Sequence, residues 1–309
     1  MKQNLQLDDL QVFCVAARRA SFAAAATELG MSPAWVSKRI AALEASLQCR
    51  LFLRSARRVT VTEDGERVYA VARQLLQEVD GVFEAASARG LEPRGSLRIS
   101  TSFRFGRLYL GPLLSQLARQ HPALDITLDV VDHRVDLLRD GLDLDVRIGE
   151  QVEEPHLVAH RLADSSRLLC AAPAYLARRG EPASVADLAG HDCLVLRDRA
   201  QAFGVWQLQG PQGAPEKVKV TGRLASNNAE VVRGWALDGH GLLLQAHWDL
   251  ADDLRAGRLQ RVLPGHLQPA SLWAVSTPRS ATSAKVRACV AFLRQALAAG
   301  PMALPALPG

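Results

Sequence analysis

Two short helices joined by a tight turn are encoded between Ser21 and Leu47, in the stretch SFAAAATELGMSPAWVSKRIAALEASL. Ser21 is a favoured N-cap residue, and Gly30 is well placed to end the first helix in the left-handed conformation. Ser32 is a second N-cap residue, followed by Pro33 at the first helical position, where its missing N–H costs nothing. Alanines in the first helix allow the second to approach closely. The stretch therefore predicts a helix-turn-helix.

The second helix has a narrow and partly basic outward face. Its apolar residues share one side at helical spacing and are expected to be buried: Val36, Ile40, Leu43 and Leu47. The opposite side carries Ala34, Lys38, Ala41 and Ala45, with Trp35, Ser37 and Arg39 on the flanks. Such a face fits the major groove of DNA, which is about 12 Å wide. Two alternatives stay open: Lys38 and Arg39 could form an ordinary solvated surface, and Trp35 could pack on the preceding helix or stack on Arg39.

Positive charge concentrates around this helix. Residues 30–60 contain one acidic residue, Glu44, and six basic residues: Lys38, Arg39, Arg50, Arg54, Arg57 and Arg58. Concentrated positive charge attracts the phosphates of nucleic acids. Free backbone amides beside Ser32, at the start of the helix, could hold one such phosphate.

A two-stranded β-wing is predicted after the second helix. Its anchoring residues are Leu51, Phe52, Val59 and Val61, while Arg54, Arg57 and Arg58 would reach the phosphates beside the groove. Thr62 is placed to cap the helix that follows.

That next helix is predicted to run uninterrupted from Glu63 to Arg89. Its apolar residues recur at alternating three- and four-residue steps: Val68, Val71, Leu75, Val79, Val82 and Ala86. Such a seam is typical of a helix that packs against a partner helix. We therefore expect a dimer, with packing on the helix's own domain as the alternative.

The residues up to Gly65 resemble the N-terminal signature of the LysR-type transcriptional regulators. The matching positions are Phe13, Ser21, Phe22, Ala25, Ala26, Leu29, Val36, Ser37, Ile40, Leu43, Glu44, Leu51, Phe52, Arg54, Thr62 and Gly65. Gln48 departs from the family, which commonly has glycine in that turn. The resemblance implies a winged helix-turn-helix that binds double-stranded DNA. Its expected DNA-binding residues are Ser21, Ser32, Pro33, Ala34, Trp35, Ser37, Lys38, Arg39, Arg54, Arg57 and Arg58.

Beyond a break at Gly90, Pro93 and Gly95, the chain alternates β-rich runs with helical patterns to about residue 299. The predicted strands are Leu97–Ser102, Asp125–Val131, Asp143–Ile148, Arg167–Ala171, Val218–Leu224, Leu242–Leu244 and Leu272–Ser276. Alternation of this kind predicts α/β structure with mostly parallel sheets and a ligand at the carboxyl ends of the strands.

The resemblance continues through residues 141–149, 170–176 and 191–194, which look like a subgroup whose members often control organic-acid or aromatic metabolism. It implies an effector domain built like a periplasmic binding protein, with two α/β lobes and an effector cleft between them. The chain should cross between lobes near 163–166 and return near 266–271. The expected domains are a winged helix-turn-helix at 1–62, a dimerising helix at 63–90, lobe I at 91–165 plus 268–300, lobe II at 166–267 and a flexible tail at 301–309.

A small organic acid is the expected effector. The end of the first strand could receive its carboxylate through Ser100, Thr101, Ser102 and Phe103. The residues expected to face it are Arg147, Cys170, Asn227, Asn228 and Gln245. Arg147 could instead pair with an internal acid such as Asp132 or Asp145, and one of the two asparagines could be a simple helix cap.

Other classes of protein are disfavoured by the sequence. The chain has no H-E-x-x-H, Walker, G-x-S-x-G or strand-linked G-x-G-x-x-G motif, so we expect no enzyme, catalytic residue or cofactor. His156 and His160 form only a weak metal-binding pattern, and we expect no metal site. Five widely spaced cysteines fit reduced thiols, with a redox role for one as an alternative.

We expect a cytoplasmic regulator, because no apolar run reaches membrane-spanning length and no leader pattern is present. A solute-binding protein would need an export signal and no DNA-binding head. The remaining alternative is a constitutive DNA-binding protein with a vestigial effector domain. The expected partners are DNA, an organic-acid effector, further copies of the chain in a homodimer or homotetramer, and RNA polymerase.

Overall fold

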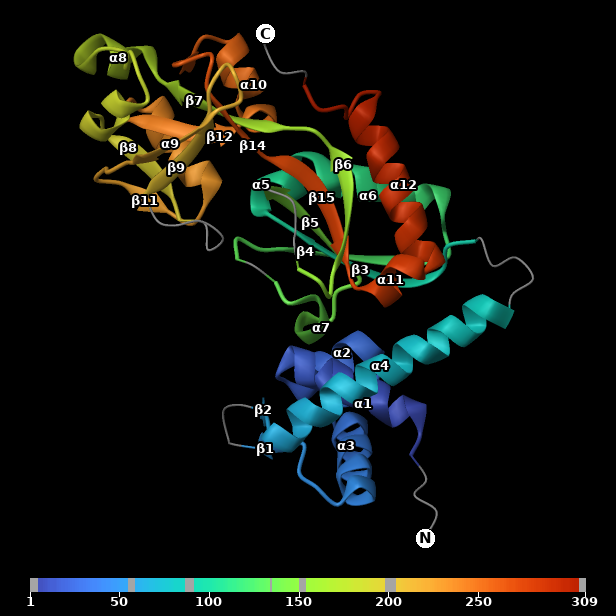
Figure 1. Cartoon of the computed structure of the whole chain (residues 1–309). Coiled ribbons are helices and arrows are strands. Elements are labelled where there is room, and N and C mark those ends of the chain that lie inside the picture. Colours follow the sequence, from blue (N-terminus) through green and yellow to red (C-terminus); the bar gives the residue numbers. More distant parts are fainter. Residues whose placement is uncertain are drawn as a thin grey trace. The chain divides into compact units, whose positions relative to one another are not determined.

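The computed structural model describes residues 5–54, 59–86, 92–133, 135–149, 154–197 and 204–305 (Figure 1). The chain divides into two compact units. One unit comprises residues 1–91 and 138–141, and the other comprises residues 92–137 and 142–309.

The first unit begins with three helices, followed by a β-hairpin and a long helix. These elements are α1 (Leu7–Arg19), α2 (Phe22–Leu29), α3 (Pro33–Leu47), β1 (Phe52–Arg54), β2 (Val59–Val61) and α4 (Glu63–Ala86). The predicted helix boundaries are confirmed. Ser21 Oγ accepts from Ala24 N at 3.3 Å, Ser32 Oγ accepts from Trp35 N at 3.2 Å, and Gly30 ends α2 with φ +66°. Residues 87–89 of the predicted long helix lie outside the described residues.

Aromatic packing holds this unit together. Phe13 of α1 is fully buried, with edge-to-face contacts to Phe52 of β1 and Tyr69 of α4 at centroid distances of 5.5 and 6.2 Å. Phe22 of α2 meets Phe52 in the same way at 5.2 Å. Three helices and the hairpin therefore share one core.

The hairpin and α4 approach closely at Gly65. Thr62 Oγ1 accepts from Gly65 N at 2.9 Å, which confirms the predicted cap of α4. A Cβ at position 65 would lie 2.4 Å from the Leu51 carbonyl oxygen, so only glycine fits there without displacement. This contact sets the distance between the wing and the long helix.

Gln48 ends α3 in the left-handed region, with φ +55° and ψ +29°. Glycine adopts this conformation without the steric cost of a Cβ, which is about 1–2 kcal/mol for other residues. We expect Gln48→Gly to raise the free energy of unfolding by about 0.5 kcal/mol, because glycine removes this steric cost. The gain is less than the full cost because glycine also increases the conformational entropy of the unfolded chain. Calorimetric melting of the full chain measures this. Gln207→Gly, the same exchange at an exposed position of strand β9 (Val205–Gln209), should lower stability, and equal effects would contradict the assignment to strain.

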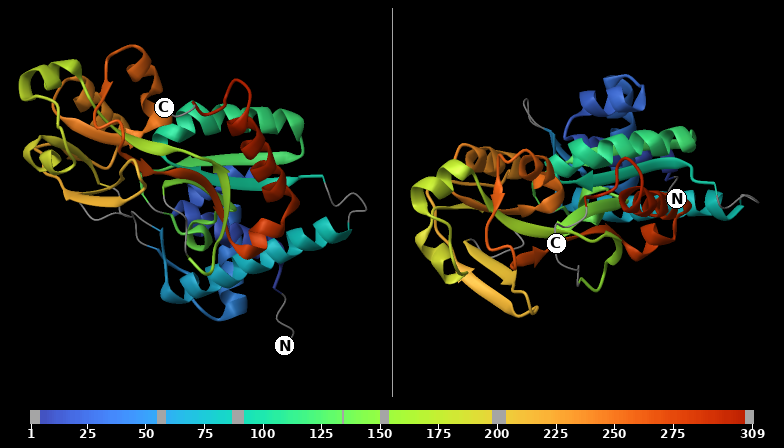
Figure 2. Two further views of the ribbon diagram at one scale, coloured as in Figure 1. Left: turned by 45° about the horizontal axis from the view of Figure 1, so that its top comes forward. Right: turned by 90° about the horizontal axis from the view of Figure 1, so that it is seen from above.

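A five-stranded sheet forms the first lobe of the second unit, in the order β4-β3-β5-β15-β6. Its strands are β3 (Gly95–Thr101), β4 (Leu124–Val130), β5 (Leu144–Gly149), β6 (Val158–Ala163) and β15 (Ser271–Ser276). The helices of this lobe are α5 (Phe103–Phe105), the π-helix η1 (Gly106–Leu110), α6 (Gly111–Gln120), α11 (Pro278–Thr282) and α12 (Ala284–Ala298). The short helix α7 (Leu137–Asp140) belongs to the first unit from residue 138 on. Helices α6 and α12 lie beside this sheet (Figures 1 and 2), and their leucines pack with residues of β3 in its core.

The segment after α12 continues this packing. Met302 and Leu304 pack against the same core, and Leu304 N donates to the Leu297 carbonyl at 3.0 Å. The predicted flexible tail at 301–309 thus begins with packed residues, while 306–309 lie outside the described part of the chain.

A second, eight-stranded sheet has the order β10-β9-β14-β7-β12-β8-β11, with β13 also paired to β7. Besides β9, its strands are β7 (Ser166–Ala171), β8 (Cys193–Leu196), β10 (Pro215–Lys219), β11 (Ala225–Ser226), β12 (Leu242–Ala246), β13 (Gln260–Arg261) and β14 (Leu267–Pro269). Its helices are α8 (Pro173–Arg179), the 3₁₀-helix η2 (Ala186–Gly190), α9 (Ala229–Leu237) and α10 (His247–Arg255). The chain leaves the first sheet after Ala163 and returns to it at Ser271.

The prediction of mostly parallel sheets is wrong, because both sheets are mixed. In the first, β3 runs parallel to β4 and β5, but β15 runs antiparallel to β5 and β6. In the second, β7 pairs antiparallel with β12, β13 and β14. The short β9–β10 connection permits only antiparallel pairing. β14 and β15 pair with strands that lie far away in the chain, so no short-range sequence pattern indicates their direction.

The predicted strand Val218–Leu224 is also wrong, since β10 ends at Lys219 and β11 begins at Ala225. Gly222 lies between them, where a Cβ would fall 1.8 Å from the Cys193 carbonyl oxygen. A close backbone approach therefore replaces the continuous strand.

Candidate DNA-binding surface and effector region

The two faces of α3 are as the sequence predicts. Val36 and Ile40 are completely buried, Leu43 is 1% exposed, and Leu47 is partly buried against the same core. The residues on the opposite side, Ala34, Lys38, Ala41 and Ala45, are all exposed. This side of α3 is accessible and narrow because its side chains, Lys38 apart, are single methyl groups.

Lys38 and Arg39 differ in their surroundings. Arg39 pairs with Asp9 at 2.6 Å, donates to Gln6 Oε1 at 2.9 Å and lies 5.6 Å from the centre of the Trp35 ring. The predicted alternative that Trp35 stacks on Arg39 is therefore confirmed. Lys38 is exposed and forms no ion pair within the described part of the chain. The geometry thus singles out Lys38 as the positively charged residue of α3 that is available to a DNA phosphate or to the edge of a nucleobase.

The other predicted DNA-binding residues are placed as follows. Ser21 and Ser32 use their hydroxyl oxygens as cap acceptors, Pro33 occupies the first position of α3, and Ser37 is partly buried beside Lys38. Arg54 lies at the end of β1, whereas Arg57 and Arg58 fall outside the described residues.

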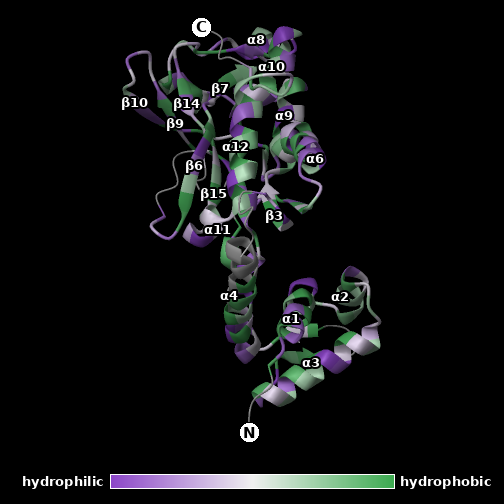
Figure 3. Cartoon of the chain, turned by 90° about the vertical axis from the view of Figure 1, so that its right-hand side faces the viewer, coloured by the Kyte–Doolittle hydropathy of each residue, from purple (hydrophilic) through white to green (hydrophobic). Residues whose placement is uncertain are grey.

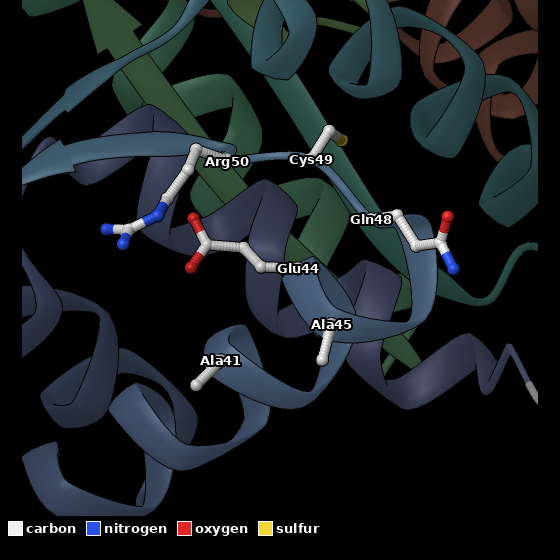
Figure 4. Close-up of a pocket in the computed structure, with 6 residues that line it drawn as sticks. All are labelled: Ala41, Glu44, Ala45, Gln48, Cys49 and Arg50. Carbon is white, nitrogen blue, oxygen red and sulfur yellow. The ribbon is translucent and has the colours of Figure 1, made fainter.

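A hollow of about 490 Å³ opens beside the end of α3 (Figure 4). Its lining residues are Ala41, Glu44, Ala45, Gln48, Cys49 and Arg50. Glu44 Oε1 accepts from the backbone N–H groups of Leu51 at 2.8 Å and Phe52 at 3.1 Å, so its carboxylate fixes the chain's exit toward the wing. The two alanines leave space along the same outward side of α3 that carries Lys38.

The long helix α4 has two apolar faces, and hydrophobic positions recur along it in Figure 3. Tyr69 and Ala72 are buried against the first unit, at 8% and 1% exposure. Val71 and Leu75 are 58% and 36% exposed. Of the predicted seam, Val68 packs against the core of the first unit, whereas Val71 and Leu75 form a second apolar face that no described residue buries.

The predicted effector residues at the end of β3 are engaged inside their own lobe. Ser100 donates to Asp145 Oδ1 at 2.6 Å and Thr101 donates to the Val146 carbonyl at 2.9 Å, and both residues are buried. Their hydroxyl protons are therefore already used. Ser102 follows as the residue before α5, with no side-chain cap hydrogen bond.

Two further predicted effector contacts do not fit this geometry. Arg147 pairs with Asp145 and with Glu154 Oε1 at 3.3 Å, which confirms the alternative of an internal acid and names Asp145. Cys170 is completely buried in the core of the second lobe, and burial raises the pKa of its thiol to about 12. The thiol is neutral and inaccessible because β7 is an interior strand of its sheet.

Asn228 brings the two lobes together. Its Oδ1 caps α9 by accepting from Glu230 N at 2.9 Å and Val231 N at 3.2 Å, as the cap alternative predicts. Its Nδ2 donates across the lobes to Asp132 Oδ2 at 2.8 Å. Asp132 Oδ1 also accepts from Phe103 N at 3.2 Å. Asn227, next to it, is exposed.

Ion pairs flank this contact. Arg104 pairs with Glu230 at 3.0 Å and with Asp249, and Arg107 pairs with Glu230 at 2.6 Å. Gln245 is 4% exposed and donates to Asp249 Oδ2 at 2.6 Å. Burial raises the pKa of Asp249, against the opposing effect of Arg104.

Sequence reasoning missed Arg104, Glu230 and Asp249. Arg104 directly follows Phe103, and Glu230 lies two residues after Asn228. Their partners lie more than a hundred residues away, so no local sequence signal indicates the pairing.

The described residues contain no cluster of three or more histidine, cysteine or acidic side chains that could hold a metal ion. Within the same ranges, no helix is both long and apolar enough to cross a membrane.

Comparisons with known proteins assign both units. Residues 7–66 match the bacterial regulatory helix-turn-helix protein family of the LysR type, and residues 90–298 match the LysR substrate binding domain. The HTH-type transcriptional regulator DmlR of Escherichia coli K12 is 49% identical over 94% of each chain. The HTH-type transcriptional activator TtdR of Escherichia coli O6:K15:H31 is 41% identical over 92% of this chain and 91% of its own.

A solved structure extends the comparison to the fold. The full-length structure of the Vibrio cholerae virulence activator AphB is 27% identical, with a TM-score of 0.58 over 94% of this chain and 98% of that one. The winged helix-turn-helix and the two-lobed effector domain expected from the sequence are thus confirmed, and this chain belongs to the LysR family of DNA-binding transcriptional regulators.

Proposed function

We propose that this regulator inserts α3 into the major groove of an interrupted palindrome and that a small organic acid bound where the two lobes meet modulates its action. It would act in the cytoplasm as a homodimer or homotetramer and contact RNA polymerase there. The observation that carries the DNA-binding part is the exposed side of α3, which combines three alanines with Lys38, a lysine that forms no ion pair with any described residue. Such a side can enter a groove without steric conflict.

The dimer proposal rests on α4. Val71 and Leu75 present an apolar face that the described residues leave exposed, and burying it against a second copy is favourable. A two-fold dimer predicts half-sites separated by about one or more turns of 10–10.5 base pairs.

We propose the domain boundaries of the sequence reading: DNA-binding at 1–62, dimerising helix at 63–90, lobe I at 91–165 and 268–300, and lobe II at 166–267.

An anionic effector is supported by the groups at the lobe junction. The backbone N–H of Phe103 and the side-chain amide of Asn228 both donate to the carboxylate of Asp132. Arg104 and Arg107 follow Phe103 in the chain and add positive charge to the junction. Phe103 and Val231 are 46% and 43% exposed, which suits the carbon skeleton of a small acid. The effector residues of the proposed site are Ser102, Phe103, Asn227, Asn228 and Gln245. Ser100, Thr101 and Arg147 are engaged by partners within their own lobe, and Cys170 is buried in the core of the other lobe.

Replacing Lys38 by alanine tests the DNA contact. Loss of one phosphate contact should weaken operator binding about tenfold and reduce the slope of log affinity against log salt by about one unit. The fold should persist because Lys38 is exposed. Lys217→Ala, on the exposed strand β10, removes the same charge and should leave DNA affinity unchanged. A weaker complex with an unaltered salt slope would rule out a phosphate role for Lys38.

The function itself is tested by a mobility-shift titration on the DNA upstream of the protein's own gene, with unrelated competitor DNA and with a panel of small organic acids. Specific binding that an acid alters supports the proposal. Failure to bind any DNA would refute the first part, and DNA binding that is indifferent to every acid would leave a constitutive DNA-binding protein.

A further inference from the structure

We propose that Asp132 is a built-in competitor of the effector: its carboxylate occupies the donors that an effector's carboxylate would use, and so holds the ligand-free lobes together. This inference rests on the proposed organic-acid effector. The carrying observation is that Phe103 N and Asn228 Nδ2, which belong to different lobes, converge on the two oxygens of one carboxylate, at 3.2 and 2.8 Å.

Asp132 is suited to being displaced. It lies in the irregular segment between β4 and α7, so its departure would break no strand ladder. Its described partners are neutral donors, unlike Asp249 and Asp253, whose side chains are at most 1% exposed and are paired with arginines. A carboxylate on a ligand can replace it with the same number of hydrogen bonds, so the exchange is nearly balanced for those bonds.

The neighbouring ion pairs remain when Asp132 leaves. Glu230 still binds Arg104 and Arg107, and Asp249 still binds Arg104. The lobes would therefore shift about a retained junction rather than separate. An effector would act only through its different affinity for the two arrangements, and the energy of the Asp132 contact would reduce its apparent affinity.

Four variants of the full-length chain separate this role from general support. Asp132→Ala removes the internal carboxylate, and Asp125→Ala removes the same charge from an exposed position on β4. Asn228→Asp keeps the oxygen that caps α9 but replaces the donor to Asp132 by a second carboxylate. Asp132→Asn combined with Asn228→Asp exchanges donor and acceptor and restores the hydrogen bond.

Hydrogen exchange of the ligand-free protein is the first measurement. Asp132→Ala and Asn228→Asp should each speed exchange in residues 229–233, on the lobe opposite Asp132, by about tenfold. Asp125→Ala and the combined exchange should stay near the wild-type rate. Unchanged exchange at 229–233 in Asp132→Ala, or no rescue in the combined variant, would overturn the proposal.

Calorimetric titration with succinate and with citrate is the second measurement. Asp132→Ala should bind these probes about tenfold more tightly than the wild type, while Asp125→Ala should match the wild type. Equal affinity of Asp132→Ala and wild type would overturn the competition and leave the organic-acid effector standing. Binding of neither probe to any variant, together with the expected exchange pattern, would count against the proposed effector but support Asp132 as the contact that holds the lobes.

Discussion

Replacing Phe13 by alanine is expected to lower the free energy of unfolding of the DNA-binding unit by about 3–5 kcal/mol, the cost of deleting a buried phenyl ring. Phe13 is completely buried, and its ring joins α1 to the wing through Phe52 and to α4 through Tyr69. The free energy of unfolding of natural domains is only about 5–15 kcal/mol, so a small unit with this substitution should lose much of its folded population at 37 °C. Calorimetry of the full chain should show an early transition, and operator binding should fall with the folded fraction.

Leu53→Ala is the matched control for this variant. Leu53 lies on β1 next to Phe52 and is 63% exposed. Its replacement by alanine also removes an apolar side chain. Its loss should cost less than about 0.5 kcal/mol. If both variants melt at the same temperature, the aromatic cluster is not what holds the unit together.

Asp253→Ala is expected to cost about 3 kcal/mol of stability in the effector domain, within the range for breaking a buried ion pair. The Asp253 side chain is completely buried on α10 and binds two guanidinium groups, that of Arg233 on α9 at 2.5 Å and that of Arg258 at 2.7 Å. Removing the carboxylate leaves Arg233, 17% exposed, beside a cavity without its counter-charge. Denaturant unfolding followed by the fluorescence of Trp235 and Trp248, on α9 and α10, measures the loss.

Asp252→Ala provides the comparison one residue away. Asp252 also pairs with an arginine, Arg255 at 2.8 Å, but its side chain is 78% exposed. Solvent-screened pairs contribute about 0–1 kcal/mol, so this variant should be close to wild type. A comparable loss in both variants would mean that burial of Asp253 does not determine its contribution.

Local structure in the DNA-binding unit could be predicted from the sequence because its signals act over a few residues. Ser21, Ser32 and Thr62 cap the helices that follow them, and the apolar spacing from Val36 to Leu43 selects the buried side of α3. The apolar residues Phe52, Val59 and Val61 also predicted the wing, in which Phe52 lies opposite Val61. Gln48, where the family commonly has glycine, still adopts the left-handed turn.

What the tertiary structure decided was every feature that joins distant segments. The sequence predicted α/β alternation but not strand direction, because β15 and β14 return from about a hundred residues away or more to pair with β5 and β7. The ion pairs of Arg104 with Glu230 and Asp249 also join segments more than a hundred residues apart. The link between Asp132 and Asn228 spans 96 residues. Capping and helical periodicity are short-range and can be read from the sequence, whereas partners for buried charges and strands are chosen only when the whole chain packs.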